Sequence, residues 1–146
     1  EALEIITQLW TGEEVNYSGE FFTINGGKLS VLPFQKPRIP IVMGCWWPHK
    51  NPFRRAAQWD GIMPAWPAMY PDMVGPQGER ATDTYEGELR ALVEYYKEQT
   101  GELPGEIILP VGKDDQRLDL FRELGVTWMI NMEIENIEDV ERGPSG

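Results

Sequence analysis

Apolar residues along the chain follow two alternating patterns, short β-branched runs and longer stretches with helical spacing. The clearest unit begins with IPIVM at residues 39–43, ends that run at Gly44, and continues through a loop and a short helix rich in Arg and Ala. A second apolar run opens after Asp60 and Gly61. Because a crossover helix joins strands that point the same way, this unit predicts a parallel sheet with the helix on its face. The loop at residues 44–51 then follows the carboxyl end of a strand, where such folds bind ligands.

The same alternation continues to residue 132. It predicts further strands over residues 61–66, 106–111 and 126–132, and helices over residues 83–101 and 114–125. The helix over 83–101 has the strongest signals, because Asp83 and Glu86 resemble a capping pair and Gly101 stands at its end. The connection over residues 67–82 is rich in Pro and Gly and is long for a compact domain, so it is a candidate lid.

The two ends of the chain carry weaker patterns. A helix is expected near residues 1–10, followed by a hairpin-like excursion over residues 15–24 and a turn at residues 25–27. No capping residue precedes the helix, so we expect the natural protein to extend before Glu1. Residues 133–146 predict one last short helix. We therefore expect one domain over residues 1–146, divided into a helix plus insertion at 1–38, four strand and helix units at 39–132, and a tail at 133–146.

Composition narrows the class of protein. The chain has 146 residues, 41% of them hydrophobic, which is enough for one sizeable core. Its formal net charge of −11 argues against nucleic acid as a partner, because phosphate binding needs a surplus of Lys and Arg. The chain has one cysteine and no apolar run long enough for a membrane span, which favours the cytoplasm.

Four strands that alternate with helices are what half of a (β/α)8 barrel contains. A complete barrel needs roughly 250 residues, so this chain is too short to close one alone. The pattern itself leaves two architectures open, a small open α/β sheet or part of a barrel.

Several segments resemble the carboxyl-terminal half of the luciferase-like flavin-dependent monooxygenases. They are EALEIITQLWTGEEVNYSGEFFTI, RIPIVMGCWW, FRRAAQWDGIMP and ELGVTWMINM, and their order and spacing carry the likeness. The resemblance implies the carboxyl-terminal half of a TIM barrel, with parallel strands alternating with helices. It also implies FMN or a deazaflavin relative as cofactor and a small organic molecule as substrate. The first four strand and helix units of the family are absent, so we expect the chain alone to lack a complete active site.

The resemblance also implies a set of site residues, although it assigns none a catalytic role. The loop after the 39–43 strand corresponds to one that holds the flavin phosphate. Its candidate cofactor-binding residues are Gly44, Cys45, Trp46, Lys50, Asn51 and Arg54. Trp47 and Trp66 are candidates for stacking on the flavin ring or an apolar substrate.

Each of these residues has a structural interpretation as well. Arg54 on an exposed helix is commonly solvated, a thiol such as Cys45 without a base partner is commonly inert, and Trp residues at strand ends often simply pack. His49 is the only histidine, which removes any multi-histidine metal site and leaves a weak general-acid candidate. The motifs of phosphate-binding loops, esterases, zinc proteases and redox dithiols do not occur.

Two other functions stay open, a non-catalytic module that binds a small ligand and an inactive truncated half-barrel. Whichever applies, a half-barrel exposes apolar surface and two strand edges. We therefore expect this chain to form a homodimer or to associate with a missing amino-terminal half.

Overall fold

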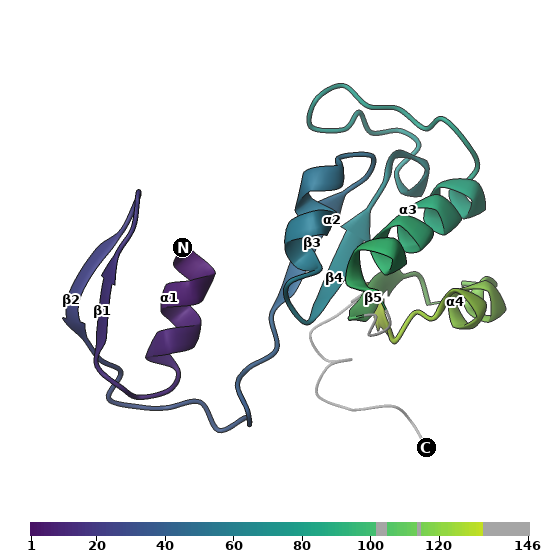
Figure 1. Ribbon diagram of the computed structural model, residues 1–146. Helices are drawn as coiled ribbons and strands as arrows, with labels where there is room; N and C mark the ends of the chain where they lie inside the picture. The colour runs from purple at the N-terminus through teal and green to yellow at the C-terminus, as the bar shows by residue number, and fades with distance from the viewer. Residues whose placement is uncertain (102–104, 114, 133–146) are drawn as a thin grey trace, which may run out of the picture. The chain divides into compact units, whose positions relative to one another are not determined.

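The computed structural model describes residues 1–101, 105–113 and 115–132 (Figure 1). The predicted tail helix over 133–146 lies outside these residues. The chain divides into two compact units, residues 1–40 and residues 41–146. Among the described residues, none of the helices is both long and apolar enough to cross a bilayer.

The larger unit is built on a four-stranded sheet in which every neighbouring pair is parallel. The strands are β3 (Val42–Trp46), β4 (Gly61–Ala65), β5 (Glu106–Val111) and β6 (Trp128–Asn131), and they lie in that order. They alternate with α2 (Lys50–Ala56), α3 (Tyr85–Thr100) and α4 (Leu118–Leu124). This arrangement confirms the predicted α/β class and matches the carboxyl-terminal half of a TIM barrel.

The strand pairing is uneven along the sheet. β3 and β4 pair over five residues each, whereas β4 and β5 pair only through Gly61 with Glu106 and Ile62 with Ile107. Further along, β4 contains Pro64 and β5 contains Pro110, and neither has an N–H to donate to a ladder. β4 and β5 are therefore joined at their amino ends and unpaired toward their carboxyl ends.

One face of this sheet carries all three helices. A single core cluster joins side chains of β3, β4 and β5 to apolar residues of α2, α3 and α4. Its largest fully buried members are Trp66, Tyr96, Phe53, Phe121, Ile62, Leu89, Leu92, Ile107 and Leu109. Because successive strand residues point to opposite faces, Ile62 with Ile107 and Leu109 defines the covered face.

Among the described residues of the larger unit, all helices lie on that face and none lies on the opposite one. Trp128 is the register partner of Ile108, and Ile130 is the partner of Pro110, so all four point away from the core cluster. Trp128 remains 60% exposed and Ile130 39%. This apolar surface, which we call the open face, is the side that a closed barrel would enclose.

Asp60 makes hydrogen bonds that link the amino ends of three strands. Its carboxylate accepts a hydrogen bond from Ile41 N–H at 2.6 Å, and its own N–H donates to Ile41 O at 3.0 Å. Its carbonyl oxygen accepts from Glu106 N–H at 2.7 Å. One residue therefore satisfies backbone groups just before β3 and β4 and at the first residue of β5, which fixes how the strands start relative to one another.

Several predicted boundaries were wrong by a few residues. The strand predicted over 39–43 begins at Val42 and continues past Gly44 to Trp46, because parallel pairing with β4 extends through that glycine. The strand predicted over 126–132 is confined to Trp128–Asn131, and the one over 61–66 ends at Ala65. Only the 106–111 strand has the predicted bounds.

The helix ends follow local hydrogen bonding. The capping pair predicted at Asp83 and Glu86 lies one residue too early, because Thr84 is the N-cap and its side chain accepts from Gly87 N–H at 3.0 Å. Gly101 ends α3 with φ of 68° and Gly125 ends α4 in the left-handed conformation. The predicted start of the last helix at residue 114 lies outside the described residues.

The smaller unit consists of α1 (Ala2–Leu9) and an antiparallel pair, β1 (Val15–Ser18) and β2 (Thr23–Gly27). The turn predicted at residues 25–27 was wrong, since these residues belong to β2 and the chain reverses at residues 19–22. There the Glu1 carboxylate accepts three backbone N–H groups, from Glu20, Phe21 and Phe22, at 2.7, 3.0 and 3.2 Å. A side chain therefore supplies acceptors for the N–H groups in the turn of the hairpin.

Replacing Asp60 tests its role at the amino ends of the strands. We expect Asp60→Ala to lower the free energy of unfolding by about 1.5–3 kcal/mol, because a partly buried N–H loses a charged acceptor. Asp60→Asn keeps an acceptor oxygen and should cost less. Urea denaturation of both variants measures this, with the exposed Asp72→Ala as control. Equal stability of Asp60→Ala and the control would contradict the assignment.

Candidate functional site

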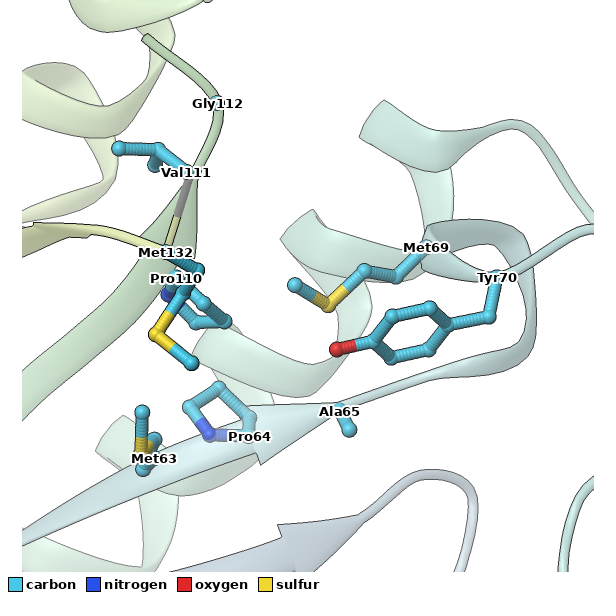
Figure 2. Close-up of a pocket in the computed structure, with 9 residues that line it drawn as sticks. All are labelled: Met63, Pro64, Ala65, Met69, Tyr70, Pro110, Val111, Gly112 and Met132. Carbon is cyan, nitrogen blue, oxygen red and sulfur yellow. The ribbon is translucent and has the colours of Figure 1, made fainter. Parts of the chain in front are cut away.

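A pocket of about 440 Å³ lies where β4 and β5 separate. Figure 2 shows Met132 beside Pro110 on one side of it and Met69 with Tyr70 on the other. The lining residues are Met63, Pro64, Ala65, Met69, Tyr70, Pro110, Val111, Gly112 and Met132. The pocket is thus at the carboxyl ends of parallel strands, where such folds bind ligands, but between β4 and β5 and not at the 44–51 loop that the sequence pattern indicated.

The residues after β4 form one wall of the pocket. A short 3-10 helix, η1 (Pro67–Met69), begins the predicted lid loop and delivers Met69 and Tyr70 to the pocket. The Tyr70 ring extends toward the pocket in Figure 2 and stacks on Trp46, with ring centroids 6.5 Å apart and an interplanar angle of 9°. Trp46 therefore supports the pocket wall from the end of β3, although it does not line the pocket.

Gly44 is an unusual residue for the middle of a strand. It is exposed, its φ is not positive, and a Cβ built on it would meet no atom within 4 Å. Neither backbone conformation nor crowding among the described residues explains a glycine here. Its register partner is Met63, which lines the pocket, whereas Gly44 itself does not line it. Glycine in a strand interior commonly marks a place where a ligand comes close.

The Cys45 side chain points toward the face of the sheet that the helices cover. Its side chain is buried in the core cluster under the helices, and its Sγ lies 3.6 Å from Met43 O. Burial raises the pKa of the Cys45 thiol to about 11. The structure therefore separates Cys45 from the side of the sheet that Gly44 and the pocket share, and it makes the thiol a packing group.

The two tryptophans predicted to stack on a ligand both pack within the protein. Trp47 contacts Phe53 edge-on at 5.8 Å and Tyr95 at 5.9 Å between ring centroids. Trp66 is fully buried and meets the Tyr85 ring at 4.9 Å. Neither residue lines the pocket, so their geometry favours the structural interpretation.

The polar candidates lie on α2. Lys50, Asn51 and Arg54 are exposed, and Arg54 donates to the Asn51 side chain at 3.4 Å. The Lys50 ammonium lies 5.0 Å from the centre of the Tyr95 ring. The helix begins at Lys50, inside the segment 44–51 that was predicted as a loop. These side chains form an exposed positive group next to the strand end that carries Trp46.

The distal part of the 67–82 loop is held against this region. His49 forms an ion pair with Glu79 when its ring is protonated, and Glu79 also accepts from Gln77 N–H at 2.9 Å. Gly75 is buried against Trp46, where a Cβ would come within 2.7 Å of the indole nitrogen. Sequence reasoning identified the loop but missed these contacts, because they depend on long-range packing.

The lining chemistry is that of a binding pocket. Apart from the Tyr70 phenol, the side chains that line it are apolar, with three methionines and two prolines among them. In the part of the chain that the structure describes, no three His, Cys, Asp or Glu side chains come together as metal ligands. Such a pocket suits the orientation and shielding of a flat apolar group. Sequence reasoning missed these residues, although Met63 and Pro110 occupy strand positions that alternate with core residues.

Comparison with known proteins gives one match. Residues 1–71 match the sequence model of the luciferase-like monooxygenase family. The match extends from α1 through η1 and includes Gly44, Trp46, Lys50, Asn51 and Arg54. No curated protein and no solved structure gives a significant match to the chain.

The buried state of Cys45 leads to a direct chemical prediction. In an unfolded chain a thiol with a pKa of about 8.5 is partly thiolate near pH 8, whereas the native thiol with its raised pKa stays neutral. We expect DTNB to label native Cys45 far more slowly than the urea-unfolded chain. Because the pKa of the native thiol is higher than that of the unfolded thiol, the unfolded chain releases the proton first. The free energy of unfolding therefore falls as pH rises from about 9 toward 11. Rapid labelling of the folded protein would contradict the burial.

Proposed function

We propose that this chain binds flavin as one wall of a flavin-dependent oxidoreductase site, because residues 1–71 are similar to the luciferase-like monooxygenase family. The cofactor is FMN or a deazaflavin relative, and the substrate is a small organic molecule. When bound, the flavin supplies the electron-transfer chemistry. The residues of this chain hold it, orient its ring and exclude water.

The observation that carries this proposal is the bare backbone at Gly44. The protein itself has room for a side chain there, and yet the position is a glycine, in register with the pocket residue Met63 on the neighbouring strand. A planar ring that lies against the strand backbone accounts for it. The pocket volume of about 440 Å³ falls in the range of small-molecule sites.

The positive charge of α2 supports a position for the flavin phosphate next to this helix. The chain is strongly acidic, with a net charge of −11, and yet α2 presents Lys50, Arg54 and Arg55 as exposed cations. In this proposal Lys50 and Arg54 pair with the flavin phosphate and Asn51 donates its amide. The apolar pocket and the cationic helix thus match the two chemically different ends of the cofactor.

Flavin titration of a Gly44 variant tests the proposal. We expect Gly44→Val to leave the free energy of unfolding unchanged or higher, because the site is open and valine favours strands. We expect the same change to weaken FMN binding by at least about tenfold, since the side chain occupies the space of the ring. Fluorescence titration with FMN measures the affinity. Failure of the wild-type chain to bind FMN overturns the proposal.

A second titration separates the ring from the phosphate. We expect Lys50→Ala/Arg54→Ala to weaken FMN by roughly tenfold and to leave riboflavin, which lacks the phosphate, unaffected. The matched control is Lys97→Ala/Arg122→Ala, which removes the same charge from α3 and α4. Equal losses in the two double variants would point to general electrostatics and refute the assignment. Binding of FMN without any turnover of reduced flavin would favour the non-catalytic alternative.

We propose further that two copies of the chain cover each other's open face. Trp128 and Ile130 are exposed on a sheet whose other face is fully occupied by helices. Parallel sheets are normally buried on both faces, and β3 and β6 are the outer strands of this sheet in the part of the chain that the structure describes. Association of two such sheets removes this apolar surface from water.

Sedimentation of a charged variant tests the self-association. We expect the wild-type chain to sediment as a dimer and Trp128→Glu to sediment as a monomer, because a charge on the open face opposes its burial. Phe34→Glu is the matched control, since Phe34 is 97% exposed but belongs to the smaller unit. A wild-type monomer at high concentration would rule out the dimer.

A further inference from the structure

Glu88 is an exceptional residue on α3. It is a charged residue, and yet only 3% of its surface is exposed. It lies in the first turns of the helix, four residues after the Thr84 N-cap. Helical side chains lean toward the helix amino terminus, so its carboxylate reaches the connection that precedes the helix.

The carboxylate joins the two ends of the 67–82 loop. One oxygen accepts from Ala68 N–H at 2.8 Å. The other accepts from Thr82 N–H at 2.8 Å and from the Thr82 hydroxyl at 3.1 Å. Three donors, one from Ala68 and two from Thr82 at the other end of the loop, therefore converge on a single side chain. Burial of a carboxylate is unfavourable unless such donors surround it, so the group and the loop ends depend on each other.

The first of these donors lies inside η1. In that helix Met69 N–H donates to Trp66 O and Tyr70 N–H donates to Pro67 O, both at 3.0 Å. η1 thus behaves as one short rigid piece, and holding Ala68 also fixes the two residues that follow it. Those two residues, Met69 and Tyr70, are the pocket wall.

We propose that Glu88 is the positioning residue for this pocket wall. Glu88 does not line the pocket itself. It acts through its hydrogen bond from Ala68 N–H, which fixes the position of the Tyr70 ring on Trp46. The distal loop has separate anchors at Gly75 and Glu79, so it does not substitute for Glu88 at the base. The proposal concerns the geometry of the wall, and it relies on the proposed function only for the identity of the ligand.

Glu88→Gln provides the test. The variant keeps the size of the side chain but replaces one acceptor oxygen with an amide NH2 that cannot accept a hydrogen bond. We expect backbone hydrogen exchange at Ala68 and Thr82 to accelerate by at least about tenfold, with the α3 and β5 core amides of Leu92 and Leu109 unchanged. The near-ultraviolet circular dichroism of the Trp46 and Tyr70 stack should change as well. Glu94→Gln, an exposed change on the same helix, is the control.

Two results overturn the proposal. One is unchanged exchange at Ala68 and Thr82. The other is uniform acceleration that includes Leu109, which would mean that Glu88 supports only global stability. If Glu88→Gln does not fold, Thr82→Val removes a single hydroxyl bond and should give a smaller effect at Ala68 and no effect at Leu109. Failure of the wild-type chain to bind FMN would leave the exchange result valid, so the two proposals fail separately.

Discussion

The limited pairing of β4 with β5 is the constraint on which the site depends. The two strands share only two register pairs at their amino ends, and each contains a proline further along. A proline cannot donate a ladder hydrogen bond, so the strands separate and leave a pocket between their carboxyl ends. The backbone chemistry of Pro64 and Pro110 thus creates space in a sheet that full pairing would have closed.

Carboxylates hold this arrangement at both ends. At the amino ends of the strands, Asp60 accepts from Ile41 N–H. At the carboxyl ends, Glu88 accepts from Ala68 and Thr82. In both places a charged acceptor satisfies backbone groups that no neighbouring strand reaches, and such bonds are stronger than those between neutral groups. Some of the acidic charge of the chain is therefore structural and fixes loops at the margins of the sheet.

Much of the fold could be predicted from the sequence because it depends on local signals. The alternation of apolar patterns predicted the parallel strands and the helix stripe that buries Leu89 and Leu92. The boundaries were less accurate, since the extension of β3 through Gly44 depends on its pairing with β4, which is not a local property. Gly44 could be singled out from its place after an apolar run, whereas Tyr70 and Glu88 could not. Their roles arise from contacts with Trp46 and Ala68 that are distant in sequence.

The distribution of aromatic residues explains how binding and stability are divided in this chain. Trp47 and Trp66 occupy adjacent ends of β3 and β4, and their rings pack against Phe53 and Tyr85 under the helices. Trp46 faces the loop instead and supports Tyr70. Neighbouring strand residues point to opposite faces, so two adjacent tryptophans serve different purposes. The aromatic ring that lines the pocket belongs to Tyr70, which follows β4. The tryptophans pack around it and around the strand ends, and so hold Tyr70 and β4 in position.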